Sequence, residues 1–396
     1  MNYYYNEEME SIETILKMLK VCSKYFPVPT IVEDQELKQK MNNLSILHNM
    51  WSNKLLDSLY PSEVYKQVCV MFSENVFRSL PKSSYMSNEE ISNEMMWEFQ
   101  QLSPVYNVFD AFLCLDGFDP EKAIIYIDKK FINLSIRRLD SCMEAERLWI
   151  KQILLKLYEK MFILRKDIYY AVINSLTDYG YQQISDFMGV KELLEIFQIY
   201  FEKNSVKETL LIKVLLPLMK RNGLVHYIMS LEFCYQSAIR RINPNLSVIF
   251  MEYILTNWST INSTLHLPWC KVLISLYQQC GVVQWSQMRH RVVRHLTKLL
   301  KSESHTICGI SIHFCVMLVN GENQLLCEDA ECISEALVDI YRTHWSYSCV
   351  TDAGSLLKRL ADDKDLLKGP SRLLALEALI DDRPHKMVQS MIEDNI

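Results

Sequence analysis

Apolar side chains recur every three to four residues along most of the chain, the spacing that places them on one face of an α-helix. The stretch from 148 to 200 shows the pattern clearly, with apolar residues at 150, 153, 154, 157, 158 and 161. It predicts a helix around these positions, a second helix from Asp167 to Leu176 that ends at the turn Thr177–Gly180, and a third from Val190 to Phe201. Strand-like alternation is not sustained here, so the pattern indicates stacked helices.

A short helical pattern centred on an aromatic residue repeats along the chain. The aromatic position falls in turn on Tyr158, Phe197, Tyr235, Tyr277 and Tyr341. The first three intervals are each about 40 residues, the period of a two-helix HEAT or armadillo repeat. The last interval is longer and leaves room for an irregular unit around Phe314. We therefore predict an all-α fold, a solenoid of HEAT-like helical pairs.

Proline and glycine interrupt the helical pattern at regular intervals, and no low-complexity linker separates one part of the chain from another. We predict a single continuous repeat array over residues 1–380, with a polar connector at 81–88. The last residues, 381–396, are expected to form a flexible tail.

Composition narrows the class of protein. The 396 residues are 49% hydrophobic and 23% charged, as in a folded soluble chain, and the net charge of −6 argues against a broad basic face for nucleic acid. We find no signal peptide and no apolar run long enough to span a bilayer. The 12 cysteines lack close pairing, so we expect reduced thiols and a cytoplasmic location, with the nucleus as a second compartment.

Motifs for catalysis are missing from the sequence. It has no Gly-x-Gly-x-x-Gly, no P-loop, no His-Glu-x-x-His and no Cys-x-x-Cys. We therefore expect no catalytic residues, no metal and no cofactor. One group has residues of the type that bind zinc, but it lacks the usual ligand pairs, so buried thiols and surface histidines are the preferred interpretation. Its members are His290, His295, His305, Cys308, His313 and Cys315.

Several sequence blocks stand in a specific order over about residues 10 to 360. They include Tyr126-Ile-Asp-Lys-Lys-Phe131, Leu157-Tyr-Glu-Lys160, Lys213-Val-Leu-Leu-Pro-Leu218 and Tyr341-Arg-Thr-His-Trp345. In their order and spacing the chain resembles the B-prime regulatory subunits of protein phosphatase 2A. The resemblance implies a curved array of HEAT-like pairs that is not an enzyme. It also implies docking on a scaffold and a catalytic subunit, and selection of phosphoprotein substrates.

The resemblance also implies a groove for short Leu-x-x-Ile-x-Glu peptides. The positions that match it are Lys156, Tyr158, Arg165, Glu195 and Ile196. An arginine can hold a carboxylate through two hydrogen bonds, a tyrosine hydroxyl can donate to it, a lysine favours an acidic neighbour, and isoleucine offers an apolar floor. Three positions depart from the family, and they put the peptide preference in question: Leu155, Met219 and Tyr200.

A second implied site is a loop that lies near the catalytic partner in the family. Asp140, Ser141, Glu146 and Arg147 match it, whereas Cys142 and Met143 replace an acidic pair. Docking is therefore expected, while regulation through this loop is in question.

Three functions remain open at this point. The first is a phosphatase targeting subunit, favoured by the ordered blocks. The second is a stand-alone helical-repeat adaptor that has lost the phosphatase, suggested by the changed groove and loop. The third is a helical metal-dependent enzyme built on residues 290–315.

Overall fold

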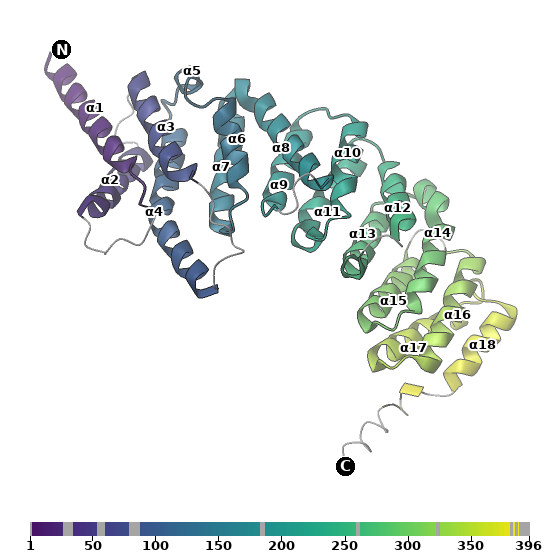
Figure 1. Ribbon diagram of the computed structural model, residues 1–396. Coiled ribbons are helices and arrows are strands. Elements are labelled where there is room, and N and C mark those ends of the chain that lie inside the picture. Colours follow the sequence, from purple (N-terminus) through teal and green to yellow (C-terminus); the bar gives the residue numbers. More distant parts are fainter. Residues whose placement is uncertain are drawn as a thin grey trace. The chain divides into compact units, whose positions relative to one another are not determined.

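The computed structural model describes residues 2–26, 35–53, 60–78, 88–182, 187–258, 262–321, 325–380, 383, 384 and 387. Within these residues every regular element is helical, so the predicted all-α fold is confirmed (Figure 1). The α-helices are α1 (Asn2–Cys22), α2 (Gln35–Ser52), α3 (Ser62–Val76), α4 (Asn88–Cys114), α5 (Pro120–Ala123), α6 (Lys129–Arg138), α7 (Glu144–Lys160), α8 (Arg165–Gly180), α9 (Val190–Lys203), α10 (Glu208–Leu218), α11 (Leu224–Arg241), α12 (Leu246–Asn257), α13 (His266–Gln278), α14 (Val282–Leu300), α15 (His305–Asn320), α16 (Cys327–Thr343), α17 (Tyr347–Asp362) and α18 (Gly369–Ile380). Two 3-10 turns precede α8 and α13, namely η2 (Phe162–Leu164) and η4 (Ser263–Leu265).

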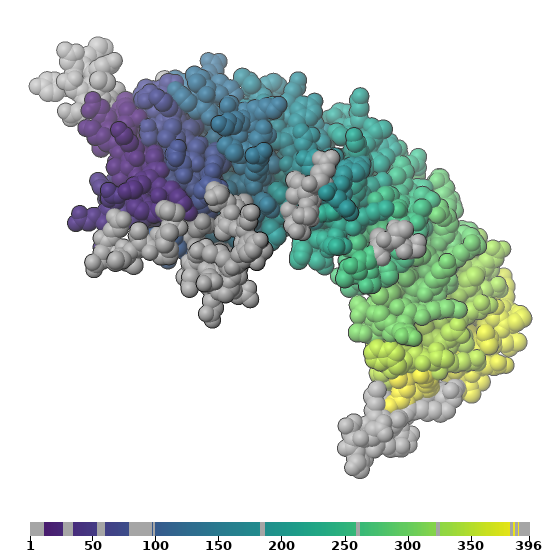
Figure 2. Space-filling model, viewed as in Figure 1, coloured from purple at the N-terminus to yellow at the C-terminus, as the bar shows by residue number. Residues whose placement is uncertain are grey.

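The helices form two compact units, Met1–Asn204 and Ser205–Ile396. In each unit a helix packs on the next helix and on the next but one, as in a stack of helical pairs: α7 contacts α8 and α9, and α16 contacts α17 and α18. Side chains of adjacent helices fill the space between the ribbons (Figure 2). None of the described helices is long and apolar enough to cross a membrane.

The repeated aromatic position marks alternate helices. Tyr158 lies on α7 and Phe197 on α9, and in the second unit Tyr235 lies on α11 and Tyr277 on α13; all four are buried. Phe314, buried on α15, continues the alternation, but Tyr341 is buried on α16, the next helix, so the last interval is irregular. The aromatic position therefore recurs on every second helix from α7 to α15.

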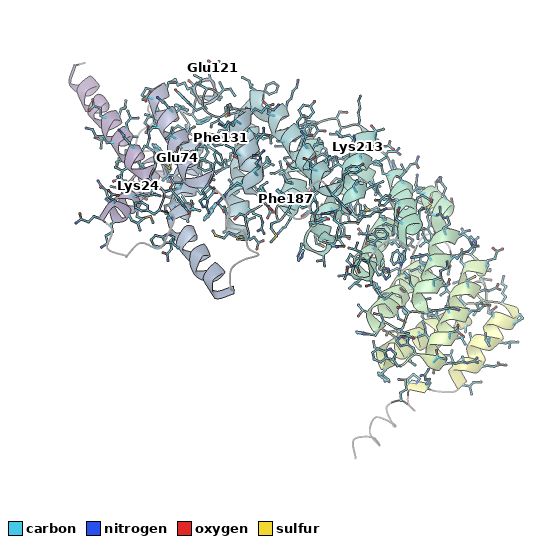
Figure 3. All side chains as sticks on the ribbon, in the orientation of Figure 1. Lys24, Glu74, Glu121, Phe131, Phe187 and Lys213 are labelled. Atoms are coloured by element: carbon cyan, nitrogen blue, oxygen red, sulfur yellow. The ribbon has the colours of Figure 1, made fainter. Side chains whose placement is uncertain are left out.

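The first unit has an aromatic core. Phe72 of α3 stacks on Phe109 of α4 with ring centroids 4.1 Å apart, and Phe131 of α6 stacks on Phe72 at 5.6 Å. Figure 3 labels Phe131 on its helix. Burial of these rings joins α3, α4 and α6, and α4 and α6 also pack against α7.

Helix α8 extends further than predicted. The residues Thr177–Gly180 were predicted to end their helix, but α8 continues through Gly180. Tyr181 caps the helix, and Gln182, two residues after Gly180, takes a φ of 64°. The helix continues because Tyr179 is buried and holds that turn against the core. The predicted connector at 81–88 lies outside the described residues except for its last position.

The predicted tail, 381–396, lies outside the described residues except for three positions. One of these positions, Arg383, donates hydrogen bonds to the carbonyl oxygens of Tyr341 and His344, each at 2.9 Å. The chain is therefore attached to α16 at this point.

Candidate functional site

The predicted groove residues lie in the first unit, around the junction of α7 and α8. Helix α7 ends at Lys160, Met161 caps it, the three residues of η2 follow, and α8 begins at Arg165. Tyr158 is buried in the last turn of α7, and Ile196 is buried on α9, which packs against α7. The structure thus places both Arg165 and Ile196 near Tyr158: the guanidinium lies against the Tyr158 ring, and Ile196 lines a small cavity with Tyr158.

Arg165 is held by the end of α7. Its Nε donates to the carbonyl oxygen of Tyr158 at 2.7 Å, and Nη2 donates to that of Glu159 at 3.2 Å. The last carbonyls of a helix have no partner within the helix and carry its negative dipole end, so a guanidinium is well placed there. The same group lies 5.1 Å from the ring centroids of Tyr158 and Phe162. The arginine is therefore oriented by the backbone and by two rings.

An apolar surface adjoins Arg165. The side chains of Phe162 and Ile163, in η2, are 76% and 69% exposed, and Tyr170 of α8 is also exposed. Large apolar side chains that stay exposed next to a fixed cation are typical of a surface that binds a partner.

The groove between α7, α8 and α9 is filled by aromatic rings. Tyr200 stacks on Tyr169 with centroids 3.7 Å apart, and its ring also meets the ring of Tyr158 at 5.8 Å. Burial, and then the nearby Tyr200 and Tyr170, raise the pKa of Tyr169 to about 12. The cavity that remains beside Ile196 is about 10 Å³, room for no more than one water.

Tyr158 already has a partner for its hydroxyl group. Asn204 donates its side-chain amide to the Tyr158 hydroxyl oxygen at 2.8 Å. The amide therefore occupies a lone pair of that oxygen, and the hydroxyl proton remains available to an acceptor.

The other two predicted groove residues form ion pairs. Lys156 is hydrogen-bonded to Asp110 of α4 and lies 3.0 Å from Cys114 Sγ. Partial burial lowers the pKa of Lys156, but the bonds to Asp110 and Cys114 outweigh it and leave the pKa raised. Glu195 of α9 accepts from Lys151 of α7 at 2.6 Å. These pairs tie α7 to α4 and to α9.

The loop before α7 is built around the buried Glu146. Its Oε1 accepts hydrogen bonds from Arg138 Nε at 2.9 Å, from Arg78 Nη1 at 3.1 Å and from the Tyr106 hydroxyl at 3.0 Å. Its Oε2 accepts from the Ser141 hydroxyl at 2.6 Å. Burial raises the pKa of Glu146, but Arg138, Arg78 and the bond from Ser141 outweigh burial and leave the pKa lowered. The charged carboxylate therefore joins the segment that follows α3 with α4, α6 and α7.

The remaining loop residues are also bonded internally. Arg147 donates to Glu192 of α9 at 3.2 Å and to the Ser141 carbonyl at 2.8 Å. Asp140 accepts from the backbone N–H of Met188 at 2.9 Å, and Gly189 fits closely against the backbone of Leu139. Cys142, Met143 and Ser141 differ in exposure: Cys142 is half-buried and the other two are buried.

Sequence reasoning missed Arg78, Arg138 and Tyr106 in the Glu146 network, and Tyr169 in the groove. Arg78 and Arg138 are charged residues on different elements, and nothing in the helical period marks them as buried. Tyr169 had a signal, since it stands on the same helix as Arg165 and one turn from it.

The six residues considered for zinc are not assembled together in the part of the chain that the structure describes. Only Cys308 of that set belongs to a group with ligand spacing there, and its companions are His344 and Cys349.

Comparisons with known proteins agree with the ordered sequence blocks. The family model described as "Protein phosphatase 2A regulatory B subunit (B56 family)" matches residues 6–368. The nematode (Caenorhabditis elegans) serine/threonine-protein phosphatase 2A regulatory subunit pptr-1 is 26% identical over 88% of this chain and 64% of its own length. The mouse (Mus musculus) 56 kDa regulatory subunit alpha isoform is 23% identical over 89% of the chain and 74% of its own length.

A third relative, regulatory subunit psrA of Dictyostelium discoideum, is 26% identical over 89% of the chain and 58% of its own length. The chain therefore spans less than two thirds of some of these relatives. A solved structure of an engineered protein aligns with 95% of the chain at a TM-score of 0.36 and 13% identity, which is too distant to support an argument.

Proposed function

Because this chain belongs to the B56 family of protein phosphatase 2A regulatory B subunits, we propose that it docks on the scaffold and catalytic subunits of that phosphatase and selects phosphoprotein substrates. The observation that carries the proposal is the family match over residues 6–368, which includes both candidate sites. The family is one of regulatory subunits and not of catalytic ones. A helical-repeat chain suits this role, because stacked repeats present extended surfaces to partner proteins.

The groove at the junction of α7 and α8 is the proposed substrate site. Arg165 presents a fixed guanidinium beside the exposed Phe162 and Ile163, so a peptide with an acidic residue next to apolar ones fits this surface. Tyr200 already occupies the space between α8 and α9 by stacking on Tyr169. We therefore propose that peptides bind over the outer surface near Arg165, and that the full Leu-x-x-Ile-x-Glu motif binds weakly.

The loop before α7 is the proposed face toward the catalytic subunit. Ser141 and Glu146 are buried in the network, so their role would be to fix the loop backbone. Asp140 and Cys142 keep exposed surface and are the side chains that would meet a partner.

Docking is tested by mixing the purified chain with scaffold and catalytic subunits and separating the mixture by size-exclusion chromatography. We expect all three to co-elute. Elution of a well-folded, helical chain alone would refute the proposal. It would favour the adaptor that has lost the phosphatase, for which the filled groove is the supporting observation.

The peptide site is tested with the charge swap Arg165→Glu. It should weaken binding of a fluorescent acidic peptide by about 2 kcal/mol or more, because it places like charges together. The matched control is Lys166→Glu, the same charge change on the neighbouring exposed residue. Circular dichroism must show that both variants fold. Equal peptide affinity in the two variants would exclude Arg165 as the contact.

A further inference from the structure

Three buried residues in the second unit place their ligand atoms together. One atom each from Cys308, His344 and Cys349 lie within 4.8 Å of one another, and these residues are 0%, 8% and 2% exposed. We propose that the two sulfurs, as thiolates, bind one soft monovalent metal ion of the Cu⁺ type, with the His344 imidazole donating a hydrogen bond to a sulfur.

The helices place both thiols at their N-terminal ends, which works against the burial that raises the pKa of the Cys308 thiol to about 12. Cys308 lies in the first turns of α15 and Cys349 in the first turn of α17, and these two helices pack against each other. The N-terminus of a helix carries partial positive charge, which stabilises a thiolate nearby. The N-terminal ends of α15 and α17 therefore both lie at the sulfur atoms of Cys308 and Cys349.

The histidine indicates which kind of metal fits. Its Nδ1 accepts a hydrogen bond from the backbone N–H of Ser346 at 3.0 Å. In a neutral imidazole the proton is then on Nε2, and Nε2 is buried without a hydrogen-bond partner. A thiolate sulfur would supply the missing acceptor. Zinc coordination by Nε2 would instead move the proton to Nδ1, where it would face the N–H of Ser346.

Thiolate pairs without further ligands select soft ions such as Cu⁺, whereas zinc in proteins is almost always four-coordinate. Binding replaces two S–H protons by two metal–sulfur bonds, so one M⁺ and two thiols give a bis-thiolate complex of charge −1 and two released protons. No electron is transferred. The hydrogen bond from the Cys349 thiol to the His305 carbonyl, 3.5 Å, is given up in exchange.

An entry route adjoins the site. His344 and Trp345 line a cleft of about 600 Å³ between the loop after α14 and the end of α16. The Trp345 ring stacks beside His344 with centroids 5.8 Å apart, and its Nε1 donates to the Glu303 carbonyl at 2.9 Å. An ion carried by a small thiol or a donor protein can approach through this cleft.

The test is an anaerobic titration of the reduced full chain with Cu⁺ in competition with the chelator bathocuproine disulfonate. We expect one equivalent to be retained, and X-ray absorption of the unaltered protein to show two sulfur ligands. Cys308→Ser and Cys349→Ser should each abolish retention. Cys315→Ser, a buried cysteine of the same helix outside the group, should leave retention unchanged.

His344→Phe should weaken retention about tenfold or more without changing the stoichiometry, because it removes a donor to a charged acceptor. Lack of a retained equivalent, or retention that survives Cys308→Ser, would overturn the proposal. So would tetrahedral thiolate absorption of added Co²⁺ that disappears in His344→Phe, since it would make the imidazole a ligand of a zinc-type site.

Discussion

Glu146→Gln tests whether the loop before α7 depends on a buried charge. Glu146 has no exposed surface, and the side chains of its partners Arg78 and Arg138 are 7% and 3% exposed. The amide keeps the shape but removes the charge that balances two buried guanidinium groups. Breaking a buried pair in this way costs about 3–5 kcal/mol. For a compact unit the size of Met1–Asn204 this corresponds to a fall of about 6–20 °C in melting temperature.

The assay is differential scanning calorimetry of the full chain, with Glu144→Gln as the matched control. Glu144 is on the same helix and forms an exposed pair with Lys191 at 3.5 Å, so its loss should cost less than about 1 kcal/mol. If Glu146→Gln and Glu144→Gln have the same melting temperature, the Glu146 network does not stabilise the loop.

The pH dependence gives a second readout of the same variant. The pKa of Glu146 in the folded chain lies below its usual value, 4.5. The contribution of the charged Glu146 carboxylate to the free energy of unfolding is therefore fully present above pH 4.5. It is lost as the pH falls through the lower pKa of the folded chain. The difference in stability between the native chain and Glu146→Gln should narrow only in that acidic range.

Three further perturbations follow from the structure. Tyr200→Ile removes the ring that stacks on Tyr169. It should strengthen binding of a Leu-x-x-Ile-x-Glu peptide about tenfold, the free energy of one good apolar contact, as measured by fluorescence polarisation. An unchanged affinity would mean that the ring does not block the peptide. Gly189→Ala places a Cβ 2.5 Å from the Leu139 carbonyl oxygen and should cost about 1–3 kcal/mol in urea unfolding, whereas Gly309→Ala, with open space around it, should not destabilise the chain. Burial lowers the pKa of Lys40 to about 8, against 10.5 for the ordinary amine, so the unfolded chain binds more protons at this side chain between these values, and the contribution of Lys40 to stability should rise with pH from about 8 to 10.5. The free energy of unfolding in urea of the native chain minus that of Lys40→Met should therefore rise across this range, and a constant difference would refute the assignment.

The repeat architecture was predictable because its signal is local. Apolar spacing of three and four residues, and an aromatic position on every second helix from α7 to α15, follow from the helical period and from burial alone. The end of α8 was not predictable in this way. Thr177–Gly180 is composed of turn-forming residues, and only the burial of Tyr179 against other helices keeps that turn helical.

The sites depend on contacts across helices, which the sequence does not display. The resemblance gave Tyr158, Arg165 and Ile196, and the structure places the last two each beside Tyr158. The resemblance gave no sign that the Tyr200 ring stacks on the Tyr169 ring and fills the space between α8 and α9. The Glu146 network is similarly invisible, because charged residues on separate helices carry no periodic mark of burial.

The sequence spacing of Cys308 and Cys349 indicates that the two thiols are paired. Cys308 was grouped with its neighbours along the chain, although its partner Cys349 stands about one repeat period further on. In a solenoid, residues separated by one period occupy equivalent positions on stacked helices. Counting by the period is therefore the better search for paired ligands in such a chain.

Helix α7 connects the loop at its start to the groove at its end, and this makes it a spacer of fixed length. Its 17 residues, Glu144–Lys160, span about 25 Å at 1.5 Å per residue. Under the proposed function, a substrate anchored beside Arg165 must reach back along this helix before a phosphorylated residue arrives at the loop. At about 3.3–3.6 Å per extended residue this takes at least roughly seven residues. The geometry of one helix would thus set a minimum separation between the anchoring motif and the phosphorylated residue in any substrate.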